Sequence, residues 1–325
     1  MSFQIISGGL VPGERQKRFK HTTKFIGGAA ICLAVSLLSA YANEIPALCD
    51  GRPYPLTQLS NSATPHVTLT VNGRPGTFLI DYGATRSLLW KTGATPGITE
   101  RLTISIPGLA SAEFLVSDAY PPPRTAEDSM GVIGTDLLSL VTVQLTDQKS
   151  YFSPGPCNPD ELRKKGLTAI DQKGFFSSDL DSIGNRRPNV PIVFLSIGDV
   201  RASAQIDTGY DDRLYPRSVD VNQAFFDRLV KNGVDLVLAG QINVKTCEGL
   251  ERRLVYSLTG LPLVIEAEDT KAIKMPELFH LVLKPSNNCG GISRMHSPAA
   301  QLGVSFLRLF ETIVFDPHAG LVWIK

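Results

Sequence analysis

The sequence predicts a mostly β chain of 325 residues, folded as two similar halves around a shared site. A repeated phrase carries this prediction, because an apolar run ends in Asp-x-Gly at Asp81 and again at Asp207. A second matched element follows in each half. It consists of two strand residues and a Gly, at Val132-Ile133-Gly134 and at Gln301-Leu302-Gly303. In addition, 22 Pro and 28 Gly are scattered along the chain, which is typical of a loop-rich β protein.

The spacing of the repeat favours duplication of a whole unit. In both halves the Gly precedes a closing Asp by 13 residues, from 134 to 147 and from 303 to 316. One Asp-x-Gly is a weak signal, since Asp in a turn often only caps backbone donors. Three matched elements in one order favour two halves that each supply a carboxylate. The alternative is duplication of a small β unit without chemistry.

The first lobe is expected over 62–153. Residues 66–71 alternate like a half-buried strand, 72–73 form a hairpin turn, and 76–81 form the return strand. A second hairpin is expected over 101–116, where Leu102 to Val116 is a candidate flap over the shared site. A short helix over 137–140 and a strand over 141–145 complete this lobe.

Residues 154–189 have weak periodicity and are expected to connect the lobes, with a short helix near 159–165. The second lobe, 190–325, repeats the strands over 190–196 and 202–207. It is longer than the first, and its extra length includes a helix expected over 222–231. The apolar face predicted for that helix consists of Phe225, Phe226, Leu229 and Val230.

The N-terminus has the pattern of a targeting segment. Basic residues precede an apolar run over 25–40, and Ala40-Tyr41-Ala42 offers a signal-peptidase site. We expect 1–42 to be a cleaved signal peptide followed by a lead-in segment, 43–61, in a periplasmic or secreted protein. The alternative is an uncleaved anchor, although a spanning helix needs about 20 apolar residues.

Charge excludes one class of partner. Without residues 1–42 the chain has 27 basic and 30 acidic residues, so no nucleic-acid surface is expected. Membrane contact is expected only through the leader, if it stays uncleaved.

Four cysteines lie beyond the leader, and an even number in an exported chain suggests two disulfides. Three connectivities are possible, and the local one is favoured, with four free thiols as the other alternative. Zinc-ligand spacings and Gly-rich nucleotide loops do not occur, so neither a metal nor a cofactor is expected. The favoured pairs are Cys49–Cys157 and Cys247–Cys289.

At its repeated motifs the chain resembles the aspartic proteases, the pepsin-like and retropepsin-like group. In that family each lobe supplies a D-[TS]-G-[AST] loop, and a hydrophobic-hydrophobic-Gly segment crosses behind it. The loops beginning at Asp81 and Asp207 match the first element, and 132–134 and 301–303 match the second. The C-terminal copy is also similar to single-lobe bacterial members, through Leu214 and Pro216.

The resemblance implies a two-lobed acid-protease β-barrel fold that hydrolyses peptide bonds. Asp81 and Asp207 would share one proton, because two carboxylates about 3 Å apart cannot both ionise. The ionised member would activate a water, and the protonated member would stabilise the oxyanion. The substrate would be an extended peptide or protein, and no dimer is required. The implied loop support is Gly83, Thr85, Thr208, Gly209, Gly134 and Gly303.

One position departs from the family pattern. Tyr82 stands where the family has Thr or Ser, whose hydroxyls link the two loops. Its ring is expected to fill a pocket near the substrate or to push the loops apart, so a catalytically inactive relative that binds peptide or a protein partner is the main alternative. A structural envelope protein is a third. Asp211 and Asp212 are interpreted as solvated loop residues, and the histidines, His66 among them, as surface or packing residues.

Overall fold

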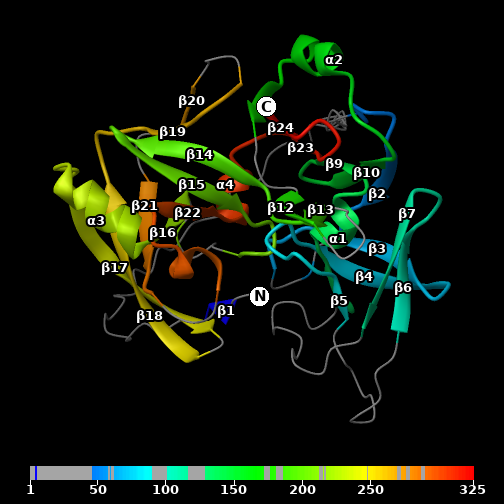
Figure 1. Cartoon of the computed structure of the whole chain (residues 1–325), viewed down its shortest axis with the longest axis horizontal. Helices are drawn as coiled ribbons and strands as arrows, with labels where there is room; N and C mark the ends of the chain where they lie inside the picture. The colour runs from blue at the N-terminus through cyan, green and yellow to red at the C-terminus, as the bar shows by residue number, and fades with distance from the viewer. Residues whose placement is uncertain are drawn as a thin grey trace, which may run out of the picture.

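The computed structural model describes residues 4–5, 46–57, 59, 62–89, 101–115, 129–171, 176–180, 186–211, 215, 217–246, 248–268, 272–275, 279–286 and 290–325 (Figure 1). Strands dominate these residues, so the predicted mostly β class is confirmed. The candidates Cys247, Cys289, Asp212, Leu214 and Pro216, and the leader apart from residues 4–5, lie outside the described residues.

The N-terminal half forms a six-stranded sheet in the order β5-β8-β4-β3-β6-β7. The hairpin predicted around Asn72–Gly73 is present, and both turn residues have positive φ, which Asn and Gly tolerate. The strands are β3 (His66–Val71), β4 (Arg74–Ile80), β5 (Leu88–Leu89), β6 (Arg101–Ile106), β7 (Ala110–Leu115) and β8 (Gly131–Ile133).

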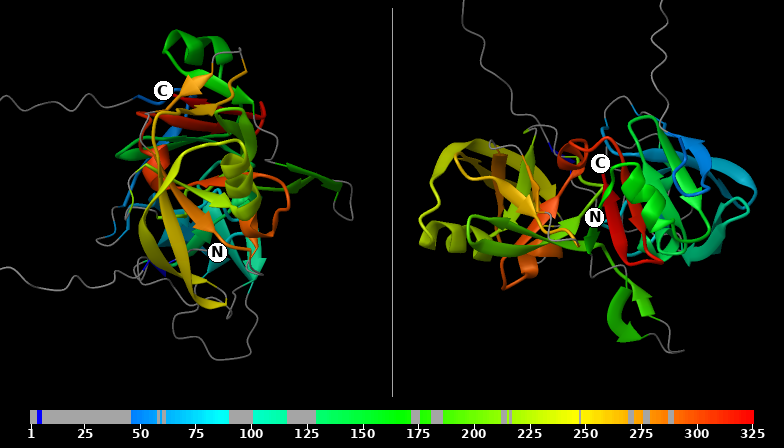
Figure 2. Two further views of the ribbon diagram at one scale, coloured as in Figure 1. Left: turned by 90° about the vertical axis from the view of Figure 1, so that its left-hand side faces the viewer. Right: turned by 90° about the horizontal axis from the view of Figure 1, so that it is seen from above.

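The C-terminal half forms a ten-stranded sheet in the order β1-β17-β18-β21-β16-β22-β15-β14-β19-β20. The right-hand view of Figure 2 shows the two halves side by side. The strands are β1 (Gln4–Ile5), β14 (Ile192–Ile197), β15 (Val200–Ile206), β16 (Ser218–Asn222), β17 (Leu236–Thr246), β18 (Gly249–Leu258), β19 (Leu263–Ile265), β20 (Ile273–Lys274), β21 (Phe279–Lys284) and β22 (Ala299–Leu302).

Six strands of the C-terminal sheet repeat the N-terminal order. The sequence β16-β22-β15-β14-β19-β20 corresponds to β5-β8-β4-β3-β6-β7. In both, the strand before the Asp-x-Gly loop pairs in parallel with a late strand, β8 or β22, which also pairs antiparallel with the strand after the loop. The additional strands β17, β18 and β21 account for much of the extra length of the second half.

A third sheet joins the halves. After β8 and β22 the chain forms matching helices, α1 (Thr135–Leu138) and α4 (Val304–Leu307), and then matching strands, β9 (Thr142–Leu145) and β23 (Ile313–Asp316), which pair with each other. We call this sheet, in the order β11-β24-β23-β9-β10-β2, the joint sheet. Its other strands are β2 (Arg52–Pro55), β10 (Lys149–Ser153), β11 (Thr168–Asp171) and β24 (Leu321–Ile324).

Two segments predicted to be a lead-in and a connection, 43–61 and 154–189, contain regular secondary structure. The lead-in segment contributes β2, and the connection between the halves contributes α2 (Pro159–Lys164) and β11. The same connection carries the small two-stranded sheet of β12 (Phe176–Leu180) and β13 (Arg186–Pro188), which projects from the rest of the fold in Figure 2.

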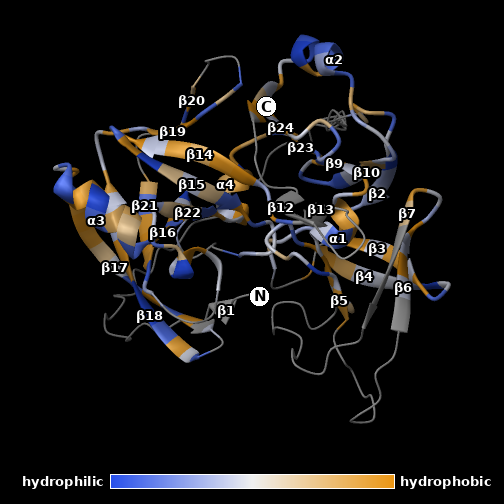
Figure 3. Ribbon diagram, in the orientation of Figure 1, coloured by the Kyte–Doolittle hydropathy of each residue, from blue (hydrophilic) through white to orange (hydrophobic). Residues whose placement is uncertain are grey.

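Apolar side chains fill one main core that includes residues of all three large sheets, and Figure 3 shows hydrophobic residues along strands such as β14 and β3. The predicted helix of the second half is present as α3 (Gln223–Lys231), capped by Asn222. Phe225 and Leu229 are buried, but Val230 is 53% exposed, so the predicted apolar face was too wide. The described residues also include a 3-10 turn, η2 (Gly291–Arg294).

The predicted disulfide between Cys49 and Cys157 is present. It connects the segment before β2 to the segment before α2, beside a small cluster that contains Leu162 and Trp323. In the described part of the chain, no helix is long and apolar enough to cross a membrane.

Candidate active site

The two Asp-x-Gly loops occupy equivalent places in the two sheets. Asp81 directly follows β4, and its backbone N–H donates to the carbonyl of Ile133 in β8 at 3.0 Å. Asp207 directly follows β15, and its N–H donates to the carbonyl of Leu302 in β22 at 3.0 Å. The parallel pairing beside each loop therefore fixes the start of both loops in the same way.

The glycine elements close both loops from behind. Gly134 and Gly303 cap α1 and α4 with extended backbone. The first N–H of each helix donates back to the loop, from Thr135 to the carbonyl of Ala84 at 2.9 Å and from Val304 to that of Tyr210 at 3.0 Å. A Cβ on Gly134 would lie 2.7 Å from that Ala84 oxygen, so the crossing requires glycine.

The loops meet through their own glycines. A Cβ on Gly83 would lie 2.2 Å from Cγ of Asp207, and a Cβ on Gly209 would lie 2.4 Å from Cγ of Asp81. Each carboxyl group therefore packs on the glycine of the opposite loop, at a distance that no side chain fits. We call Asp81 and Asp207 together the carboxyl pair.

Thr208 links the two loops, as the family resemblance implied. Its Oγ1 donates to the carbonyl of Ile80 at 2.6 Å and accepts the N–H of Tyr82 at 3.0 Å. Both bonds are buried and join residues 126 or more apart in sequence. Thr208 therefore ties the second loop to the backbone on both sides of Asp81.

The carboxyl pair is shielded from water, with Asp81 2% and Asp207 7% exposed. Oδ1 of each accepts the N–H of its own loop glycine, at 2.8 Å from Gly83 and 3.0 Å from Gly209. Burial raises the pKa of Asp207 well above its usual range, and the charge of Asp81 and a hydrogen bond with that residue raise it further. A negative charge on Asp81 therefore favours the protonated form of Asp207.

Tyr82 lies in the core, in neither of the places expected from the sequence. Its side chain is fully buried and stacks on Phe315 of β23, with ring centroids 3.8 Å apart and an interplanar angle of 16°. Burial raises its pKa well above the usual value, and the charge of Asp316 raises it further. The ring therefore anchors the first loop to the joint sheet and leaves the two loops in contact.

Other predicted loop residues have different roles from those expected. Thr85 is exposed, and the loop is instead braced by Ser87, whose hydroxyl donates to Asp136 at 2.6 Å and accepts the N–H of Gly134 at 3.0 Å. Asp211 is half-buried rather than solvated, because its Oδ2 accepts the N–H of Ala63 at 3.1 Å.

Sequence reasoning missed the polar residues that lie against Asp207. Gln301, inside the second glycine element, donates from Nε2 to Asp207 Oδ2 at 2.7 Å. Lys284, the last residue of β21, donates to Gln301 Oε1 at 3.2 Å. The sequence signal for this contact was Gln301 itself, a polar residue at a position that is hydrophobic in the aspartic-protease pattern.

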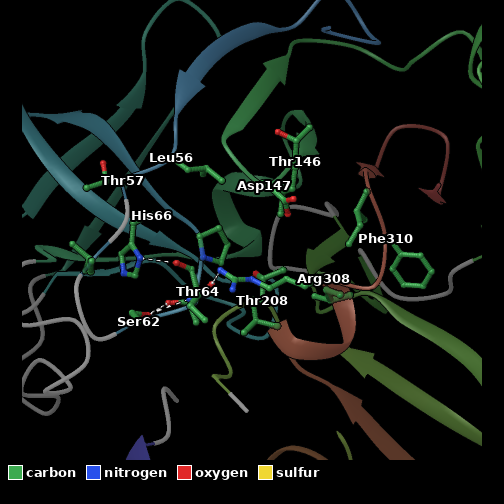
Figure 4. Close-up of a pocket in the computed structure, with 17 residues that line it drawn as sticks. Leu56, Thr57, Ser62, Thr64, His66, Thr146, Asp147, Thr208, Arg308 and Phe310 are labelled. Carbon is green, nitrogen blue, oxygen red and sulfur yellow. Dashed lines mark hydrogen bonds between the residues drawn. The ribbon is translucent and has the colours of Figure 1, made fainter. Parts of the chain in front are cut away.

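A cavity of about 460 Å³ lies beside Thr208, where residues 56–57, 59 and 62–66, the end of β9 and the segment after α4 meet (Figure 4). Neither member of the carboxyl pair lines it. Arg308 crosses the cavity region and donates to the carbonyl of Ala63 at 2.9 Å. His66 is a buried packing residue on its wall, with Nδ1 donating to the carbonyl of Thr64 at 2.9 Å. Burial lowers the pKa of His66 despite that bond.

The hairpin of β6 and β7, the predicted flap, has its tip on the joint sheet. Arg52 of the edge strand β2 donates to the carbonyl of Pro107 in this tip at 3.0 Å. The tip therefore contacts β2, and Leu109 beside it packs against the main core, so the covering role stays a prediction.

Within the described ranges, no group of three or more His, Cys, Asp or Glu side chains is arranged to hold a metal ion. No family model matches the chain, and no curated protein matches it in sequence. Among solved structures, conglutin gamma, a basic 7S globulin from lupine seeds, is similar over 84% of this chain and 94% of its own. The identity is 10% and the TM-score 0.46, values at which the similarity does not bear on the site.

Proposed function

We propose that the protein is an aspartic endopeptidase in which Asp81 and Asp207 form the catalytic dyad. The observation that carries this proposal is the reciprocal packing of each carboxyl group on the glycine of the opposite loop. Such packing brings two acids together out of water, which is the arrangement that lets one proton be shared. The repeated strand order and the joint sheet support a pepsin-like or retropepsin-like pair of lobes.

The chemistry follows from the shared proton. The ionised carboxylate takes a proton from a bound water as its oxygen attacks the peptide carbonyl carbon, and the protonated carboxyl gives its proton to the carbonyl oxygen. The tetrahedral intermediate then collapses, with cleavage of the C–N bond and transfer of a proton to the amine. Because the pair titrates as a unit, either Asp can hold the proton at the start.

The proposed substrate is a peptide or protein segment in an extended conformation. We place the protein in the periplasm or outside the cell, which the Cys49–Cys157 disulfide supports because such bonds persist in oxidising compartments.

The test is digestion of a peptide library by the full chain and by the chain from Asn43 onward, between about pH 3 and 7, read by mass spectrometry. Asp81→Asn and Asp207→Asn should each abolish cleavage. Asp199→Asn, which removes an exposed carboxyl from a hairpin turn, is the matched control and should cleave like the native protein.

The second candidate is a non-catalytic relative that binds peptide or a protein partner. Tyr82 favours it, because its ring packs on Phe315, whereas Thr208 links the loops through its hydroxyl. Folded protein that cleaves no peptide at any pH but binds members of the library would replace the endopeptidase proposal with this one.

A further inference from the structure

The residues at matched positions around the two carboxyl groups differ in polarity between the halves. The matched strand registers pair Leu79 and Leu88 with Val132 in the first half, and Gln205 and Asp220 with Gln301 in the second. The fourth position, three residues after each Asp, is Ala84 or Tyr210. We call the first set the apolar quartet (Leu79, Ala84, Leu88 and Val132) and the second the polar quartet (Gln205, Tyr210, Asp220 and Gln301).

The apolar quartet forms a small hydrophobic cluster of its own. The polar quartet is nearly as deeply buried, with Tyr210, Asp220 and Gln301 at most 2% exposed. Burial of polar groups is costly unless they are hydrogen-bonded. The polar quartet therefore needs partners that the first half does not have, and Lys284 and Arg253 supply them.

Lys284 is connected to the carboxyl pair through Gln301. Its ammonium group, 1% exposed, donates to Gln301 Oε1 at 3.2 Å, and Gln301 Nε2 donates to Asp207 Oδ2 at 2.7 Å. An ammonium group can only donate, so it fixes the amide with its oxygen toward Lys284 and its NH₂ toward Asp207. Asp207 thereby accepts bonds on both oxygens, since Oδ1 accepts the N–H of Gly209.

Lys284 also lies near the ion pairs of Arg253. Arg253 donates to Asp220 at 2.9 Å and to Glu251 at 2.6 Å, and Tyr210 donates to Asp220 Oδ1 at 3.2 Å. Burial lowers the pKa of Lys284 and the charge of Arg253 lowers it further, whereas the charges of Asp220, Asp207 and Glu251 raise it. The ammonium group therefore interacts with both Asp220 and Asp207, and its hydrogen bond to Gln301 connects it to the carboxyl pair.

We propose that Lys284 is a positioning residue for the carboxyl pair, acting through Gln301, which it orients to donate to Asp207. The cation and the oriented amide both stabilise negative charge on the pair. Burial and the charge of Asp81 raise the pKa of Asp207, and the cation and the amide counteract both effects. The charge of Lys284 acts to lower this pKa. The single negative charge that the chemistry needs is therefore kept to lower pH than the buried acids alone would allow.

The experiment is an NMR titration of the native full chain labelled with ¹³C at the Asp carboxyl carbons, with Asp207→Asn used for assignment. Lys284→Met and Gln301→Leu should each raise the midpoints of the carboxyl pair, the first by about one pH unit or more. Lys284→Arg, which keeps the charge, should shift them less. Lys274→Met removes an exposed lysine from β20 and should leave them unchanged.

If Lys284→Met does not fold, Gln301→Leu tests the proposal instead. This variant places an apolar side chain at position 301, as Val132 does at the matched position of the first half. Midpoints that stay at the native values, or move down, overturn the proposal. In a folded Lys284→Met variant that cleaves peptide, kcat/KM should show the same upward shift in its pH profile with KM little changed. A residue with only a structural role would not move that profile.

This inference rests on the proposed function for its catalytic meaning, but the titration needs no cleavage. Absence of cleavage by the native chain, with the expected NMR shifts, would remove the endopeptidase proposal and keep Lys284 as a positioning residue. Cleavage by the native chain with unshifted midpoints in the variants would keep the endopeptidase proposal and remove Lys284 as a positioning residue.

Discussion

Tyr82 stacks on Phe315, with ring centroids 3.8 Å apart, so the first Asp-x-Gly loop is anchored directly to a strand of the joint sheet. Tyr82 stands next to Asp81 in the first loop, and Phe315 belongs to the closing strand of the second half. Their contact therefore links the first Asp-x-Gly loop to a strand of the second half. A threonine at position 82 would be too short to make this contact.

The first prediction concerns this ring. Tyr82→Thr should lower the free energy of unfolding by about 3 kcal/mol, because it leaves a cavity against Phe315. Tyr82→Phe keeps the stacked ring and should cost no more than about 1 kcal/mol. Equilibrium denaturation measures both. Equal losses in the two variants would show that the hydroxyl, and not the packing, makes the contribution.

Much of the fold could be predicted because its signals are local. The hairpin around Asn72–Gly73, the strand before Asp207 and the capped helix α3 all follow from short-range alternation and turn residues. The pairing of equivalent elements in the two halves was also accessible, since the repeat lies in the sequence itself.

The rest depends on contacts between distant segments, which a local pattern does not encode. Residues 52–55 join the joint sheet only because β10 offers them an edge, about a hundred residues away along the chain. The partner of Tyr82 lies in β23, and the partners of Gln301 come from β21 and the second loop. Each of these contacts depends on how the strands are arranged in three dimensions, whereas the sequence patterns predict each strand separately.

The second prediction tests the close approach of the loops. Gly83→Ala and Gly209→Ala should each reduce peptide cleavage at least about 100-fold, since the new methyl group would displace the opposite carboxyl and catalysis tolerates little misplacement. Gly155→Ala is the matched control, because nothing lies within 4 Å of a Cβ there. Steady-state kinetics on a cleaved peptide measures the loss. Activity within a few-fold of native in both loop variants would contradict the placement of the carboxyl pair.

The third prediction concerns Thr208. Thr208→Val keeps the shape of the side chain but removes the bonds to Ile80 and Tyr82, and should cost about 2–4 kcal/mol because two buried backbone groups lose their partner. Thr208→Ser keeps the hydroxyl and should recover most of this stability. Denaturant titration of the three proteins decides the point, and equal stability of the Val and Ser variants would exclude the proposed link.

The fourth prediction concerns the disulfide. Replacing Cys49 and Cys157 together by Ala should lower the free energy of unfolding by about 2–5 kcal/mol, because the bridge closes a long loop in the unfolded chain. Thermal melts with and without reductant provide the measurement. Reduction of the native protein should reproduce the effect of the double variant, and a melting temperature insensitive to both would contradict it.

The fifth prediction concerns pH and needs no substrate. The pKa of Asp207 is raised in the folded protein by burial and by Asp81, whereas in the unfolded chain it has the usual value of about 3.9. Between these two values the folded protein binds a proton that the unfolded chain has released. The contribution of Asp207 to stability is therefore fully present below about pH 4 and is lost as pH rises through the folded pKa, with a limiting slope of about 1.4 kcal/mol per pH unit. Asp207→Asn removes this proton, so denaturation measured from about pH 4 upward should show a steeper loss of stability in the native protein than in the variant. Parallel stability curves for the two proteins would mean that the carboxyl pair holds no shared proton in the folded state.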